Sequence, residues 1–120
     1  MTNCYCDDNS PEFYSVRTVT ARKPHRCDEC RKVAIAPGEK YEYVSGLWDG
    51  NFNYFKTCHA CKDLATWVAF NVPCVCLAHG EMIERCKEAV IEARDRAPDE
   101  TRGLYFEFLR RLYKIKRAAA

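Results

Sequence analysis

Two pairs of cysteines with the same short spacing constrain this chain more than any other feature. Cys27 and Cys30 form one C-x2-C pair, and Cys58 and Cys61 form a second pair later in the chain. A C-x2-C turn can place two thiolates on one ion, and two such turns complete the tetrahedral shell that zinc prefers. The spacing therefore predicts a metal site made of these four cysteines, with zinc as the expected ion.

The same ligand set limits the chemistry of that site. Four protein ligands leave no coordination position for water or substrate, which distinguishes structural zinc sites from catalytic ones. Iron in a rubredoxin-like site is the alternative metal, and four buried cysteines without a metal are the other alternative. His25 and His59 lie beside the two pairs, but because four thiols are available we expect these histidines to be exposed or to support the ligands.

The remaining cysteines suggest a second metal site. Cys4 and Cys6 form a C-x-C pair, and so do Cys74 and Cys76. In an extended chain the side chains of residues i and i+2 project to the same side, so each pair can offer both sulfurs to one ion. We therefore expect two zinc ions per chain, the second one bound by these four cysteines.

Two further residues bear on the second site. His79 follows Cys76 by three residues, so a mixed site in which His79 replaces one cysteine is a close alternative. Thiols that are partly buried or lie in a loose terminus are the alternative without a metal. Cys86 is the unpaired member of the nine cysteines, and because it falls on the apolar stripe of a predicted helix we expect it to be a small core residue.

Residue patterns around the first site predict an α+β fold. Segment 15–21 has the composition and polar alternation of a strand. Segments 41–44 and 52–57 are predicted to form a hairpin, since the loop between them contains an Asp-Gly step that suits a tight turn. Apolar residues then recur at helical spacing from the second cysteine pair until residues 71–73. The order of knuckle, hairpin and helix is that of a small treble-clef-like zinc module.

The rest of the chain is predicted to be helical. An apolar stripe over 82–93 indicates one helix, a proline-containing break follows at 97–99, and a second stripe over 105–115 indicates a last helix with a cationic opposite side. We expect residues 1–80 to form the zinc-binding module with an N-terminal arm, and residues 81–120 to form a helical extension packed on it as one compact unit.

The N-terminal sequence and the hydropathy pattern predict a cytoplasmic protein. The chain begins without a basic segment followed by an apolar run, and no stretch approaches the roughly 18 apolar residues of a membrane span. Disulfides are rare in a reducing compartment, and cysteines in short pairs favour metal ligation there. The formal net charge of +2 is too small to indicate a partner by itself.

Several longer motifs resemble a known group of proteins. They are CYCD at 4–7, PEFYS at 11–15, TARKPHRCDEC at 20–30, PGEKYEYVSGLWDG at 37–50 and VPCVCLAHG at 72–80. These motifs are similar to those of small cysteine-rich, zinc-finger-like proteins of phages and prophages, a group with no activity to transfer. The resemblance implies a phage or mobile-element origin, and so the cytoplasm of the host, and it supports a role for both C-x-C pairs. Residues 81–120 lie outside it.

The favoured functional hypothesis is a non-enzymatic binding protein that contacts a host protein or protein complex as an inhibitor or an adaptor. A small rigid scaffold suits this role when it displays aromatic anchors. The candidate anchors of the hairpin are Tyr41, Tyr43, Trp48, Phe52 and Tyr54. We expect no membrane partner and no small-molecule substrate.

Nucleic-acid binding is the alternative. Basic residues that could contact phosphates lie near the first cysteine pair: Arg17, Arg22, Lys23, Arg26, Arg31 and Lys32. A sequence pI of about 8.1 is lower than that of a strongly basic nucleic-acid binder. A metal-dependent nuclease of the HNH type is the least favoured hypothesis, because none of the three histidines lies in the hairpin where its chemistry would be located.

Overall fold

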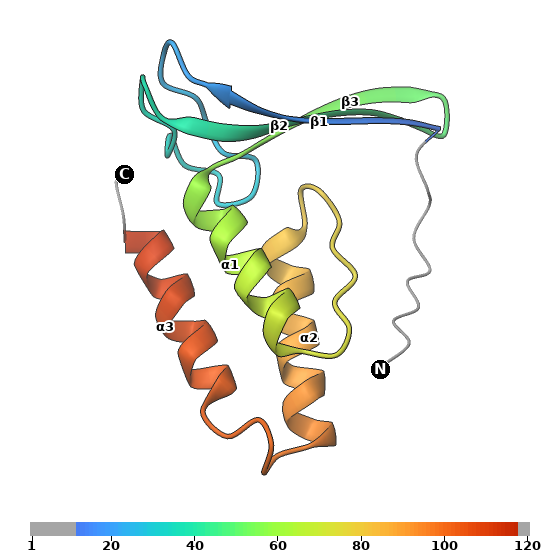
Figure 1. Cartoon of the computed structure of the whole chain (residues 1–120), viewed down its shortest axis with the longest axis vertical. Helices are drawn as coiled ribbons and strands as arrows, with labels where there is room; N and C mark the ends of the chain where they lie inside the picture. Colours follow the sequence, from blue (N-terminus) through green and yellow to red (C-terminus); the bar gives the residue numbers. More distant parts are fainter. Residues whose placement is uncertain (1–11, 118–120) are drawn as a thin grey trace.

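The computed structural model describes residues 12–117 and consists of one antiparallel sheet and three helices (Figure 1). The strands are β1 (Phe13–Thr20), β2 (Lys40–Trp48) and β3 (Asn51–Thr57), arranged in the order β1-β2-β3. The helices are α1 (His59–Asn71), α2 (Met82–Arg96) and α3 (Leu104–Arg117). The structure is therefore a small α+β fold.

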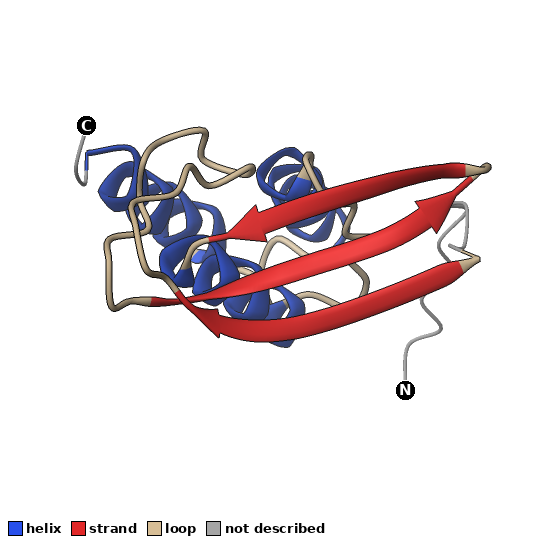
Figure 2. Ribbon diagram, turned by 90° about the horizontal axis from the view of Figure 1, so that it is seen from above, coloured by secondary structure: helices blue, strands red, loops and turns tan. Residues whose placement is uncertain are grey.

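The sheet and the helices form two layers. All three helices lie on one side of the sheet, and α1 begins directly after β3 at the end of the sheet (Figure 1). Seen from above, the end of the sheet that carries the β2–β3 turn extends past the helices (Figure 2). The helices thus cover the inner side of the sheet at one end and leave its other side uncovered.

Strand register divides the side chains of the sheet between these two sides. Phe13 pairs with Leu47, which pairs with Phe52 on the other side of β2, so these three residues share one face. The neighbouring positions point the opposite way. Val44 is fully buried, and Glu42 forms an ion pair with Lys62 of α1, so this second face is the one that packs on the helices.

The β2–β3 turn follows the local sequence. Asp49 and Gly50 have φ values of 51° and 78°, which is the positive-φ pair that a two-residue type I′ turn requires. The predicted hairpin is confirmed, with Trp48 and Asn51 as its last paired residues.

A single cluster of buried side chains connects the layers. Val68 of α1, Val90 of α2 and Phe108 of α3 are each completely buried in it, together with cysteines of the two C-x2-C pairs. The predicted apolar stripes are the faces that meet here, because a helix can bury only one face against its neighbours.

Candidate metal centre

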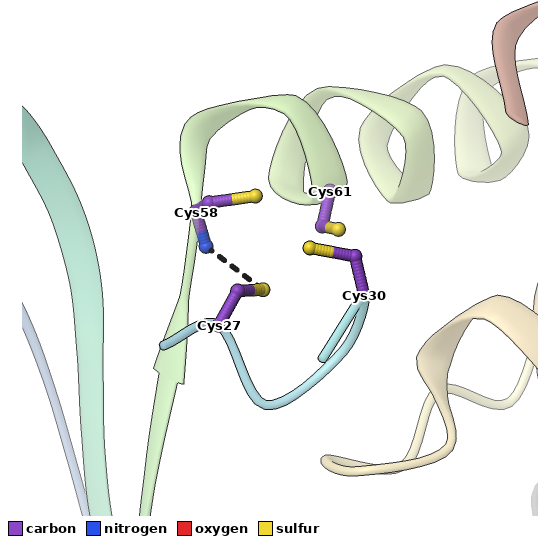
Figure 3. A group of neighbouring side chains, drawn as sticks. All are labelled: Cys27, Cys30, Cys58 and Cys61. Atoms are coloured by element: carbon purple, nitrogen blue, oxygen red, sulfur yellow. Dashed lines mark hydrogen bonds between the residues drawn. The ribbon is translucent and has the colours of Figure 1, made fainter. Parts of the chain in front are cut away.

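The four cysteines of the two C-x2-C pairs come together at one end of the sheet. The sulfur atoms of Cys27, Cys30, Cys58 and Cys61 all lie within 4.8 Å of one another. Figure 3 shows the four side chains converging on a common centre, two from the loop between β1 and β2 and two from the start of α1. Cys27, Cys58 and Cys61 are buried and Cys30 is half-buried.

This arrangement fits a tetrahedral metal ion. With a zinc–sulfur distance of about 2.3 Å, the sulfurs of a regular tetrahedron are about 3.8 Å apart. The observed separations therefore require only small shifts of the side chains to reach that geometry. A set of four sulfurs suits zinc or iron, and it fills a four-coordinate shell completely.

Backbone amides point at the sulfur of Cys27. The amide of Cys58, at the N-cap of α1, donates to it over 3.3 Å, and the amide of Glu29 donates over 3.4 Å. The amide of Arg31 donates to the carbonyl oxygen of Cys27 over 2.9 Å, and Arg31 has the left-handed φ of 64° that closes this turn. Amide donors and the N-terminus of a helix both stabilise negative charge on the thiolates.

The thiols influence one another strongly when no metal is bound. Hydrogen bonds from the thiols of Cys58 and Cys61 hold the pKa of Cys27 far below its ordinary value. The same bond to Cys27 raises the pKa of Cys58 to about 12, and the pKa of Cys61 is raised as well. A cation at the centre would offset the repulsion between several thiolates in so small a space, and a bound metal ion would supply that charge.

The two residues between the first pair of ligands fasten the knuckle to the rest of the fold. The carboxylate of Asp28 accepts a hydrogen bond from the amide of Lys56 over 2.6 Å, which ties the knuckle to β3. The buried carboxylate of Glu29 accepts bonds from the amides of Gly80 and Met82, over 2.8 and 3.0 Å. Neither role can be predicted from the sequence, because no local pattern links Asp28 to Lys56 or Glu29 to Gly80 and Met82.

The histidines beside the cysteine pairs lie outside the cluster. His59 is exposed and pairs with Asp63 over 3.1 Å. The His25 ring lies 5.2 Å from the ring of Tyr41, and its Nδ1 atom is 3.1 Å from the ammonium group of Lys56. Within residues 12–117 the cluster therefore contains only the four cysteines.

His79, the alternative ligand for the second site, lies beneath the sheet. Its Nε2 atom is 2.7 Å from the hydroxyl of Tyr14, and its ring stacks on Phe55 at 5.3 Å. Its Nδ1 atom is buried without a hydrogen-bond partner among the described residues. Burial lowers the pKa of His79, so the neutral ring is favoured.

The other cysteines have two different environments. Cys74 and Cys76 are each disulfide-bonded in this structure. Their expected co-ligands Cys4 and Cys6 lie outside the described residues, so the second zinc site stays a prediction. Cys86 is a free thiol, completely buried, and burial raises its pKa to about 11. This agrees with its expected place in the core.

The hairpin aromatics divide between buried and exposed positions. Tyr41 points to the side of the sheet away from the helices but is only 7 % exposed, and the ring of His25 in the loop after β1 lies against it, so it cannot serve as an exposed anchor. Trp48 is half-buried on the inner face, where it makes edge contacts with Tyr14 and Phe55. Phe52 and Tyr54, by contrast, are strongly exposed.

Within residues 12–117, no helix combines the length and apolar character that crossing a membrane requires. No protein-family model matches the chain, and neither a curated protein nor a solved structure shows significant similarity to it.

Proposed function

We infer that this chain is a non-enzymatic, zinc-stabilised binding protein that uses the uncovered side of its sheet as its contact surface. We call this side the outer face and define it by the outward-pointing residues Phe13, Ser15, Arg17, Tyr43, Ser45, Leu47, Phe52, Tyr54 and Lys56. The observation that carries this proposal is a group of exposed rings on that face.

The rings of the outer face are exposed and contact one another. Phe13, Phe52 and Tyr54 are 50 %, 56 % and 60 % exposed. The Phe13 and Phe52 ring centres are 6.1 Å apart, and those of Phe52 and Tyr54 are 6.4 Å apart. Single exposed apolar residues are ordinary, but a contiguous aromatic patch is typical of an interaction site.

The metal centre supports a structural role in this proposal. Its four thiols occupy every position of a tetrahedral shell, and its ligands come from the knuckle and from α1. A bound zinc ion would therefore join the loop before β2 to the helix after β3 in a treble-clef-like arrangement, and so hold the sheet in place. The resemblance to phage proteins extends the proposal to an accessory factor of a phage or mobile element, for which a host protein complex is the partner expected from sequence.

A capture experiment tests the contact surface independently of the partner's identity. Wild-type protein, a Phe52→Ala/Tyr54→Ala variant and a Phe106→Ala variant are used as baits with the same zinc content. Phe106 is the matched control, because its ring is 81 % exposed but lies on α3. We expect captured macromolecules to be lost only with the first variant. Equal capture by all three baits would show that the outer face is not the contact surface.

One observation favours nucleic acid over protein as the partner class. The strands place two cations and no acidic side chain on the outer face. The nucleic-acid alternative is therefore the one that the charge of this face supports.

A further inference from the structure

We propose that the outer face binds single-stranded nucleic acid by stacking bases on its exposed rings. This inference rests on the proposed function, because it assigns a partner class to the same surface.

The rings form a platform that spans the whole sheet. Phe13 lies on β1 and Phe52 lies opposite on β3, with Leu47 of β2 between them in the same row. Phe52 and Tyr54 are stacked with an interplanar angle of 26°, and the Tyr43 ring centre is 6.1 Å from that of Tyr54. Exposed rings on an antiparallel sheet can stack with unpaired bases and so bind single strands.

Cations follow the rings along the sheet. The guanidinium group of Arg17, an exposed residue, lies 5.5 Å from the centre of the Tyr43 ring. Lys56 of β3 pairs with Tyr43 from the other side, so it belongs to the same face. A guanidinium group beside an aromatic ring can contact a phosphate while the ring stacks on the adjoining base.

The loop after β1 continues this positive track. Arg22, Lys23 and Arg26 are exposed. The contacts of His25 with Tyr41 and Lys56 place this loop beside the outer face, because both of those residues point to that side of the sheet. A phosphate backbone that runs from the rings toward this loop would therefore meet two cations and no acidic side chain on the strands.

Two acidic residues near this track, Asp28 and Glu12, lie outside the strands, on the knuckle and just before β1. The Asp28 carboxylate is held by the amide of Lys56, and Glu12 accepts a bond from the amide of Gly50 at the far turn. An aromatic surface with this charge pattern suits a polyanion with exposed bases. In a duplex the faces of the bases are covered by their neighbours, so stacking favours a single strand.

Fluorescence anisotropy with labelled oligouridine and oligothymidine of about ten nucleotides tests the proposal. The zinc-loaded protein should bind both single strands more tightly than a duplex of equal length. Phe52→Ala and Tyr54→Ala should each weaken binding about five- to a hundredfold, while Phe52→Tyr keeps the stacking ring and should retain binding. The control Phe106→Ala should leave the affinity unchanged.

The salt dependence supplies a second readout. Arg17→Gln should lower the slope of log affinity against log salt by about 0.7, the value for one contact with a single-stranded phosphate. Arg102→Gln is the matched control, since its side chain is 85 % exposed but lies between α2 and α3, and it should leave the slope unchanged.

Several results would overturn the proposal. They are no measurable binding of single strands at low salt, equal affinity for the duplex, or equal weakening by Phe52→Ala and Phe106→Ala. If proteins are captured after nuclease treatment and are lost with Phe52→Ala/Tyr54→Ala, while the oligonucleotides do not bind, the outer face remains the contact surface and its partner is a protein. Failure of both experiments would instead remove the outer face as a binding surface.

Discussion

At the scale of single residues, the knuckle between Cys27 and Cys30 connects three parts of the molecule. Asp28 bonds to the end of β3, and Glu29 bonds to the backbone just before and at the start of α2. A metal ion bound by the flanking cysteines would therefore fix the positions of the hairpin and of α2 at once. The cysteine cluster is therefore part of the core, in which Cys27, Cys58 and Cys61 are buried.

Replacing one ligand should therefore unfold the protein. Binding of structural zinc contributes about 10–16 kcal/mol at neutral pH, which equals or exceeds the stability of an ordinary small domain. We expect Cys58→Ser to lose its metal and its fixed tertiary structure, measured by elemental analysis and near-UV circular dichroism. Cys86→Ala is the control, because Cys86 is buried but lies outside the cluster, and it should keep its zinc. A metal-free Cys58→Ser protein that unfolds cooperatively would contradict this prediction.

The role of Glu29 can be separated from metal binding. Glu29→Ala leaves two amide donors near the start of α2 without their acceptor, so we expect a loss of about 2–3 kcal/mol in the free energy of unfolding, with the zinc content unchanged. Glu29→Gln keeps one acceptor oxygen and should lose less.

Glu81 provides the control for this prediction. It is exposed and occupies the N-cap of α2 without making a side-chain capping bond, so Glu81→Ala should change the stability by only a few tenths of a kcal/mol. Urea denaturation measures the free energy of unfolding of the three variants, and hydrogen exchange shows whether the first amides of α2 lose protection. Equal effects of Glu29→Ala and Glu81→Ala would refute the assigned role.

At the scale of elements, the sheet depends on a close packing of Trp48 against its own strand. A Cβ atom added at Gly46 would lie 2.4 Å from the Trp48 ring and 2.9 Å from the carbonyl oxygen of Phe13. The glycine thus lets the indole turn inward, toward Tyr14 and Phe55, and lets β1 approach β2.

Gly46→Ala should disturb this packing without touching the metal site. The ring or β1 must move, so we expect a destabilisation of about 1–3 kcal/mol and a change in tryptophan fluorescence. Ser45→Ala is the control, because Ser45 precedes Gly46 in β2 and points to the outer face, and this variant should have little effect on stability. If Gly46→Ala were as stable as the wild type, the ring would not be held where the structure has it.

At the scale of the whole molecule, bound zinc would make folding strongly dependent on pH. The ligands of a zinc ion are thiolates, whereas the thiols of the unfolded chain have pKa values of about 8.5. Coordination thus depresses the pKa of the cysteines in the folded state. The resulting stability is present above the pKa of the unfolded thiols and is lost as the pH falls.

Four protons taken up on unfolding correspond to a loss of about 5 kcal/mol per pH unit below neutrality. From about 10–16 kcal/mol at pH 7, the zinc-bound fold should collapse about two to three units lower. Zinc release and loss of near-UV circular dichroism should coincide on acid titration. Zinc loss at acid pH with the tertiary signal intact would show that the metal does not hold the fold together.

The number of metal ions is also a property of the whole chain. If the two C-x-C pairs bind a second ion, native mass spectrometry under reducing conditions should count two zinc ions, and one ion after Cys74→Ser/Cys76→Ser. Without reductant, the disulfide-bonded state of Cys74 and Cys76 should lower the count to one. A count of one in the reduced wild-type chain would remove the second site.

Local patterns in the sequence were sufficient for several features. The C-x2-C spacings identified Cys27, Cys30, Cys58 and Cys61, which the fold brings together. The Asp-Gly step located the hairpin, and helical periodicity located α1 and the buried position of Cys86. Each of these features depends on residues that are close in sequence, and the covalent chain keeps such residues close in space.

Only the tertiary structure decided which side chains are available for binding. Alternation along a strand assigns side chains to two faces, but the packing of the helices decides which face is covered, and so Trp48 lies inside while Phe52 and Tyr54 lie outside. The bonds of Glu29 to Gly80 and Met82 likewise join positions more than fifty residues apart. Contacts of this kind form when whole elements pack together, so the spacing of residues within each element does not reveal them.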